Sequence, residues 1–284
     1  MSLFKYLFIF LSCLVAITAN AQNIERELAN ELYVKSGLEK EVSHLPETIS
    51  AAFIQAAQQD EFLMRLPRST ISRINDQIYN SFSLKRFKNI LISEMQSDLN
   101  AADIRKVIKW LDSPLGIKCT NLEDAASTAE AFKEIQSYAA KLEKYPPDSN
   151  RLKLLQRWDS AIRGTEFLVE LAISTQLATE VGILAALHTD QPLDVSKIRK
   201  EIEKSRPQIE EMMKAYMNVA MLYTYDSLAD SELEEYILFA NSKAGKKYHR
   251  VVFSGFQKAM VDASLKMGNS IKEVIEATQE QTET

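Results

Sequence analysis

The stretch that decides the fold occurs twice, as LNAADIRKVIKWLDSPLGIK at Leu99–Lys118 and as LADSELEEYILFANSKAGKK at Leu228–Lys247. The two copies align without a gap at a spacing of 129 residues. Five aligned pairs are identical: Leu99/Leu228, Ile108/Ile237, Ser113/Ser242, Gly116/Gly245 and Lys118/Lys247. Self-similarity at a fixed spacing is typical of repeated structural units. We therefore infer an internal duplication.

Each copy carries the signals of a corner between two helices. Ser113 and Pro114 are typical of a helix start, because the hydroxyl caps free backbone amides and proline lacks the amide hydrogen that would have no partner there. Gly116 leaves room for another backbone. Ser242 and Gly245 repeat the cap and the glycine in the second copy. The shared positions therefore predict a structural motif and not a reacting centre.

The composition favours helix along nearly the whole chain. Among 284 residues there are only 7 Gly and 7 Pro, and 46% are hydrophobic, which is enough to fill a core. We predict an all-α protein made of two similar helical-bundle halves. The prolines and glycines also predict that Asn121–Leu142 is one helix and that Leu152–His188 is one helix or two, with Gly164 or Gly182 as the break.

Prolines and end composition divide the chain further. Tyr145-Pro146-Pro147-Asp148 cannot continue a helix, so residues 146–149 are predicted to link a first helical domain, 22–145, to a second, 150–277. Residues 278–284 are polar and are predicted to form a disordered tail.

The first 21 residues have the pattern of a signal peptide. Lys5 precedes the apolar run Tyr6–Ile17, and Ala19-Asn20-Ala21 fits a cleavage site, so we predict cleavage after Ala21 and export. The alternative is lipidation at Cys13. No later segment looks long and apolar enough to cross a membrane, so the chain after Ala21 is predicted to have no transmembrane segment.

The repeated motif resembles a known family. An acidic helix start, an aromatic residue and then Ser-Pro-x-Gly-x-Lys are similar to the bacterial domain of unknown function 2059, although the second copy has Lys243 where that family prefers proline. The resemblance implies an exported, all-helical, periplasmic protein and brings no catalytic residues. The motif residues are Trp110, Ser113, Pro114, Gly116, Lys118, Phe239, Ser242, Gly245 and Lys247.

The sequence contains no pattern that is typical of a cofactor site. His44, His188 and His249 lie at spacings that make no zinc pattern. Cys119, the one cysteine after residue 21, is interpreted as a small buried apolar residue. We predict no cofactor and no metal.

Two other groups of side chains allow more than one interpretation. Met213, Met217 and Met221 share one helical face, which suits a core and, as the alternative, Cu(I). A group of tyrosines near the second copy suits helix packing and, as the alternative, a ligand pocket. Its members are Tyr216, Tyr223, Tyr225 and Tyr236.

The sequence does not name an activity. The net charge of −5, or −6 without Lys5, argues against a nucleic-acid binder. We interpret the chain as a non-catalytic binding or interaction module of the cell envelope, with an unknown protein or small-ligand partner. The alternatives are an envelope hydrolase and a carrier of an apolar ligand between the two halves. A hydrolase predicts a cleft with converging titratable groups, whereas a carrier predicts an apolar cavity.

Overall fold

The computed structural model describes residues 25–59, 61–144, 147–187 and 193–283. The protein is 89% helical, and the described residues contain no strand, which confirms the all-α prediction. After a first helix at 25–35, the elements are α2 (Leu38–Ser43), α3 (Leu45–Ala57), α4 (Glu61–Met64), α5 (Arg68–Ser81), α6 (Leu84–Asp98), α7 (Ala101–Leu111), α8 (Pro114–Ala126), α9 (Ala129–Lys144), α10 (Ser149–Ile162), α11 (Gly164–Leu187), α12 (Val195–Ile202), η1 (Glu203–Ser205), α13 (Arg206–Thr224), α14 (Asp230–Asn241) and α15 (Lys243–Glu283).

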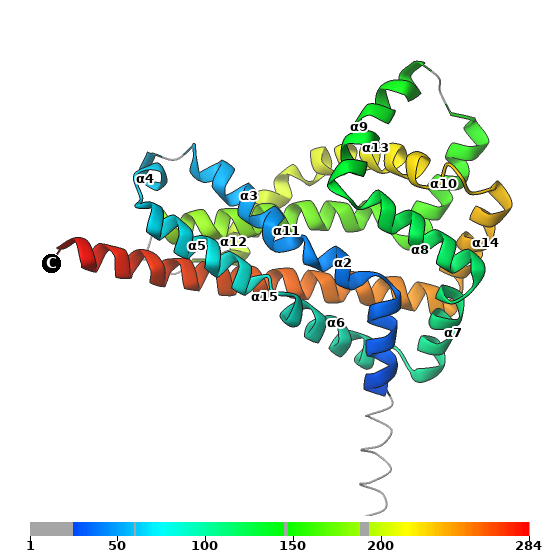
Figure 1. The fold of residues 1–284 in the computed structure, drawn as a ribbon, viewed down its shortest axis with the longest axis horizontal. Coiled ribbons are helices and arrows are strands. Elements are labelled where there is room, and N and C mark those ends of the chain that lie inside the picture. The colour runs from blue at the N-terminus through cyan, green and yellow to red at the C-terminus, as the bar shows by residue number, and fades with distance from the viewer. Residues whose placement is uncertain (1–24, 60, 145–146, 188–192, 284) are drawn as a thin grey trace, which may run out of the picture.

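Two long helices, α11 and α15, lie side by side through the middle of the molecule (Figure 1). Helices α5, α6 and α7 also pack along α15, while α3, α12 and α13 pack on α11. Buried residues of α15 recur at helical spacing, as at Tyr248, Val251, Phe256, Met260 and Met267. Such a stripe places one face of a long helix in the core.

The largest hydrophobic core contains residues from both sides of the predicted linker. Phe87 of α6 lies against Phe256 of α15, with 5.8 Å between ring centroids, and both rings are buried. Ile49 of α3 and Ala178 of α11 belong to the same core. The predicted halves, 22–145 and 150–277, are therefore packed on each other.

Two predicted helix boundaries inside the chain have different outcomes in the structure. The break at Gly164 is confirmed, because Arg163 adopts a left-handed conformation (φ 61°) between α10 and α11. The single helix Asn121–Leu142 is wrong: α8 ends at Ala126, and the Thr128 hydroxyl accepts a hydrogen bond from the Ala131 amide at the start of α9. The prediction took a polar Ser-Thr pair as helix interior when it is a cap.

The end of the chain is also more regular than predicted. Helix α15 continues to Glu283, so residues 278–283 are helical and the predicted disordered tail is wrong for them. The hydroxyls of Thr70 and Thr278 lie 3.3 Å apart, which joins this last part of α15 to α5.

Helix α11 contradicts the sequence-based statement that no later segment is long and apolar enough to cross a membrane. With 24 residues it is long and apolar enough to cross a membrane. In the structure it is a central packing element, because α3, α12, α13 and α15 surround it. A core helix that is covered on several sides has this same composition.

Candidate functional site

The first copy of the repeated stretch forms the corner between α7 and α8. Asn100 caps α7 by accepting a hydrogen bond from the Asp103 amide at 2.8 Å. Ser113 caps α8 in the same way, with 3.0 Å from the Gly116 amide to the hydroxyl oxygen, and Pro114 occupies the first turn. A Cβ on Gly116 would lie 2.1 Å from the carbonyl oxygen of Trp110. The glycine is therefore required for the tight corner.

The second copy forms an equivalent corner between α14 and α15. The Ser242 hydroxyl accepts from the Gly245 amide at 3.1 Å, and a Cβ on Gly245 would lie 2.2 Å from the Phe239 carbonyl oxygen. Ala229 stands where the first copy has Asn100 and cannot cap. Its amide donates instead to Glu232 at 2.9 Å.

The two corners meet through matching positions, which we call the corner joint. Trp110 stacks on Phe239 with ring centroids 4.1 Å apart and planes 6° apart. Lys118 of the first corner pairs with Glu232 of the second at 2.8 Å. Lys247 of the second corner pairs with Asp103 of the first. Each corner thus contributes one aromatic ring, one lysine and one carboxylate to the joint, as in a two-fold symmetric interface.

All nine predicted motif residues therefore lie in the corners. Their side chains cap helices, allow close approach or join the corners, and none lines the two hollows described next.

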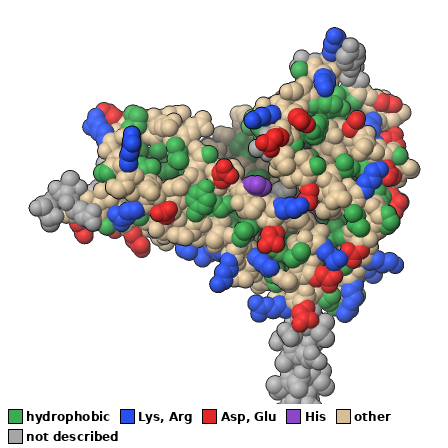
Figure 2. Space-filling view, in the orientation of Figure 1, with side chains coloured by type: hydrophobic (Ala, Val, Ile, Leu, Met, Phe, Trp, Pro, Cys, Tyr) green, Lys and Arg blue, Asp and Glu red, His purple; other side chains and the backbone are tan. Residues whose placement is uncertain are grey.

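A partly enclosed apolar chamber of about 270 Å³ lies between α2, α11 and α15. Figure 2 shows that this face of the molecule is hollowed near its middle, with hydrophobic side chains in the hollow. The chamber lining is Leu38, Val42, Leu45, Ile162, Gly164, Phe167, Leu168, Leu171, Met217, His249, Val252, Phe253 and Phe256. The first three precede the predicted linker and the others follow it. The chamber therefore lies between the two predicted halves.

His249 is the one ionisable side chain among the described residues that line the chamber. Burial lowers the pKa of His249 to about 4, so the imidazole is neutral at pH 7. Its Nε2 atom is shielded from solvent and has no hydrogen-bond partner among the residues that the structure describes. A neutral ring in apolar surroundings is not poised as a general base near neutral pH.

A second hollow, which we call the aromatic cleft, adjoins the chamber at Leu171 and Met217, which line both. It has a volume of about 510 Å³ between α3, α8, α9, α10 and α13. Four aromatic side chains line it: Phe132, Trp158, Tyr216 and Tyr225. Glu123 is the one charged residue among the described residues of this lining.

Two buried tyrosines hold the Glu123 carboxylate in place. The hydroxyls of Tyr225 and Tyr236 donate to its Oε1 at 2.7 and 3.0 Å. Burial, and then the negative charge of Glu123, raise the pKa of both tyrosines well above the usual value. Both hydroxyls thus remain protonated donors at neutral pH.

Cys119 lies in the same region and is buried, as predicted. Burial, followed by the charge of Glu123, raises the pKa of its thiol to about 12. The thiolate is the reactive form of cysteine, and the raised pKa keeps this buried thiol protonated at neutral pH.

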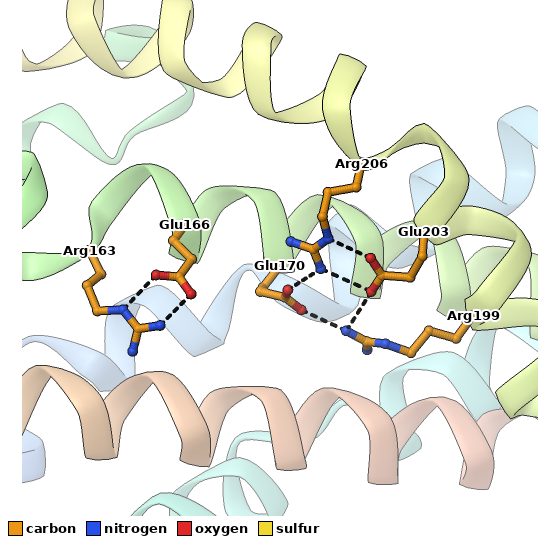
Figure 3. Close-up of polar contacts among 6 residues, drawn as sticks. All are labelled: Arg163, Glu166, Glu170, Arg199, Glu203 and Arg206. Atoms are coloured by element: carbon orange, nitrogen blue, oxygen red, sulfur yellow. Dashed lines mark hydrogen bonds and ion pairs between the residues drawn. The ribbon is translucent and has the colours of Figure 1, made fainter.

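An ion-pair network fixes α11 to α12 and α13 (Figure 3). Glu170, buried in α11, accepts hydrogen bonds from Arg199 at 2.7 Å and from Arg206. Burial alone raises the pKa of Glu170, but the hydrogen bonds from the two guanidinium groups outweigh it and the net shift is downward. Glu203 bridges the same arginines. Because every charged group of the network has an opposite partner, we assign it to the fold.

The other candidates from the sequence are spread through the molecule. Met221 is buried, Met213 and Met217 pack against two different core clusters, and the side chain of Met212 is 58% exposed. Among the described residues, no group of His, Cys, Asp and Glu is arranged to hold a metal ion. His188, residues 1–21 and Pro146 of the predicted linker lie outside the described residues.

The chain was compared with protein families, curated proteins and solved structures. The chain matches no protein-family model, no curated protein and no solved structure at a significant level.

Proposed function

We propose that this protein is a non-catalytic binding module that carries a small apolar ligand in the chamber between its two halves. The observation behind the proposal is the lining of the chamber: twelve of its thirteen residues are aliphatic, aromatic, sulfur-containing or glycine. Ligand pockets are mostly apolar, with few polar groups. The carrier interpretation of the sequence predicts such a cavity.

The envelope hydrolase is the weaker alternative. A hydrolase needs an acid, a base or a nucleophile converging on a bond, and the described lining residues of the chamber offer only a neutral imidazole. The buried thiol of Cys119 has its pKa raised, which does not suit attack on a substrate.

The proposal also includes export of the protein and an internal duplication of its sequence. The pattern of residues 1–21 supports cleavage after Ala21 and a periplasmic location, and the resemblance to the domain of unknown function 2059 supports the same compartment. The matched corners support an internal duplication. Mass spectrometry of the N-terminus tests export: a chain beginning at Gln22 is expected, whereas Met1 retained in the cytoplasm would refute it.

Octan-1-ol is a suitable probe of the chamber. An apolar cavity of about 150 Å³ holds benzene, so this chamber takes roughly ten non-hydrogen atoms. Burying each CH₂ is worth about 0.8 kcal/mol, from which the cost of association is subtracted. We expect calorimetry to give one site with a dissociation constant of about 0.1 to 1 mM.

Leu168→Trp tests whether octanol binds in the chamber, since Leu168 lines the chamber and the larger tryptophan side chain would fill it. We expect octanol binding to be lost. Leu238→Trp is the matched control, because Leu238 is 72% exposed and lies outside the chamber. Equal binding by both variants would refute the proposal.

A further inference from the structure

We infer that the outer face of α7 and the first turns of α15 bind the surface of an anionic phospholipid membrane. Six exposed cationic side chains form this face, which we call the basic face: Arg105, Lys106, Lys109, Lys243, Lys246 and Arg250. The inference goes beyond the ligand chamber and does not require it. The choice of a membrane over other polyanions rests on the export that belongs to the proposed function.

Helix α7 contributes three cations on its solvent side. Arg105, Lys106 and Lys109 are exposed, whereas the buried residues of this helix lie on its other side. Residues three and four positions apart are neighbours on a helix surface. Between Asp103 and Asp112 the helix has no acidic residue. The solvent side of α7 is therefore cationic along this part of the helix.

The first turns of α15 contribute the other three cations. Lys243, Lys246 and Arg250 are exposed at positions i, i+3 and i+7, so they share one face of the helix. Helix α15 packs on α7, and Lys247 pairs with Asp103 of that helix. Both helices bury one side in the core and expose the other. Their cations therefore lie on the same outer surface.

The basic face has no anionic partner within the described part of the chain. None of its six side chains makes an ion pair or a hydrogen bond with another described residue. None lines the chamber or the aromatic cleft. Figure 2 shows Lys and Arg side chains along the lower edge of the molecule, over α6 and α7. Exposed cations outside a hollow suit a broad anionic surface more than a small ligand.

The corner geometry does not account for these cations. The positions aligned with the three α7 cations in the second copy hold no lysine or arginine: they are Glu234, Glu235 and Leu238. At the same spacing of 129 residues, the positions aligned with the three α15 cations are Pro114, Ile117 and Asn121. Both corners nevertheless have the same serine cap and the same glycine. The fold of a corner is therefore compatible with an outer face that lacks cations.

Clustered cations are attracted to anionic lipid headgroups. This attraction acts within about a Debye length of the membrane, so it requires the cations to face the headgroups. The whole chain has a net charge of −5, so the surface outside the basic face is acidic and is repelled by the same headgroups. The difference orients the molecule with its basic face on the membrane. Nucleic acids carry charge of the same sign, but export would separate the protein from them.

The test is co-sedimentation of the purified protein with two kinds of vesicle, phosphatidylcholine alone and an equal mixture with phosphatidylglycerol. We expect the partition coefficient in 0.1 M salt to be about tenfold higher on the anionic vesicles. This preference should disappear in 1 M salt, where the Debye length is about 3 Å. Any apolar leader that the protein retains acts on both vesicles, so the ratio reports the charge.

Two results of this comparison would overturn the inference. One is an equal partition coefficient on both vesicles in 0.1 M salt, or a preference that survives 1 M salt. The other is a double-stranded oligonucleotide that binds as tightly as the anionic vesicles in 0.1 M salt, which would contradict the choice of a membrane. A failure of export appears in the mass of the N-terminus and not in the vesicle ratio, so the two failures are distinguishable.

Variants locate the contact. Two triple variants should each remove most of the preference for anionic vesicles: Arg105→Gln with Lys106→Gln and Lys109→Gln, and Lys243→Gln with Lys246→Gln and Arg250→Gln. The control removes three exposed cations from α9 and α10, which lie apart from α7 in Figure 1, and should keep most of the preference: Lys133→Gln, Lys141→Gln and Lys153→Gln. An equal loss in the control would mean that net charge alone drives binding, which would overturn the inference. The comparison of vesicles and salts on the unaltered protein decides it even if a variant does not fold.

Discussion

At the scale of single residues, His249 makes the stability of the folded protein depend on pH. Its pKa is about 4 when folded and 6.5 in an exposed chain, so the unfolded state binds a proton between these values that the folded state does not. The free energy of unfolding should therefore fall as the pH drops from 6.5 to 4, by up to about 3 kcal/mol. Above pH 6.5 the residue contributes no pH dependence.

His249→Phe tests this contribution. Because Nε2 has no hydrogen-bond partner in the described part of the chain, we expect the variant to keep or raise stability at pH 7 and to reduce the loss between pH 6.5 and 4 in urea unfolding. His44→Asn is the control, since His44 is exposed at the start of α3. An unchanged pH dependence in His249→Phe would show that the ring is already protonated or solvated in the folded protein.

Gly245 tests the geometry of the corners. Gly245→Ala puts a methyl carbon about 2.2 Å from the Phe239 carbonyl oxygen, so backbone must move, and we expect a loss of roughly 1–3 kcal/mol in thermal unfolding. Gly255→Ala on the same helix meets only side-chain atoms, at 3.0 Å or more. It should be neutral or stabilising, because alanine favours helix. Equal effects at both positions would contradict the assignment.

At the scale of elements, the corner joint holds the α7–α8 corner on the α14–α15 corner. The Lys247–Asp103 pair is the more buried of its two ion pairs, with side chains 27% and 8% exposed, against 40% and 33% for Lys118–Glu232. A double-mutant cycle with Lys247→Met and Asp103→Asn should give a coupling of about 1–2 kcal/mol. The cycle at Lys118 and Glu232 should give less. The reverse order would mean that the joint is not packed as described.

At the scale of the whole molecule, the shared core predicts cooperative unfolding. Residues from both sides of the predicted linker fill one core, and both tryptophans, Trp110 and Trp158, pack on a second cluster that also draws on both sides. We expect tryptophan fluorescence and far-ultraviolet circular dichroism to give one coincident urea transition. Two separated transitions would show that the halves unfold independently.

The corners could be predicted from sequence because a helix cap spans three residues. Ser113 with Gly116, and Ser242 with Gly245, are local patterns whose geometry depends little on the rest of the chain. The same local reasoning failed at Ser127 and Thr128, where polar residues that a helix can tolerate end one instead.

The hollows could not be predicted, because they depend on contacts between distant residues. Leu38 of α2 and Phe256 of α15 line the same chamber. No periodicity in the sequence predicts that these two residues lie near each other. Phe132 illustrates the limit, since large apolar side chains are usually buried and the structure exposes this one at the cleft. The tyrosine group was visible in the sequence, but Glu123, which two of its members contact, was not.

The most direct measurement of ligand binding in the chamber is the methyl spectrum of the protein labelled with ¹³C-methyl methionine during an octan-1-ol titration. Met217 lines both hollows, whereas Met64 lies at a separate surface hollow near α4, and Met212 is exposed. We predict a saturable shift of the Met217 signal, assigned with Met217→Leu, while the signals of Met64 and Met212 stay in place. Shifts at Met64 or Met212 with Met217 unmoved would contradict the account.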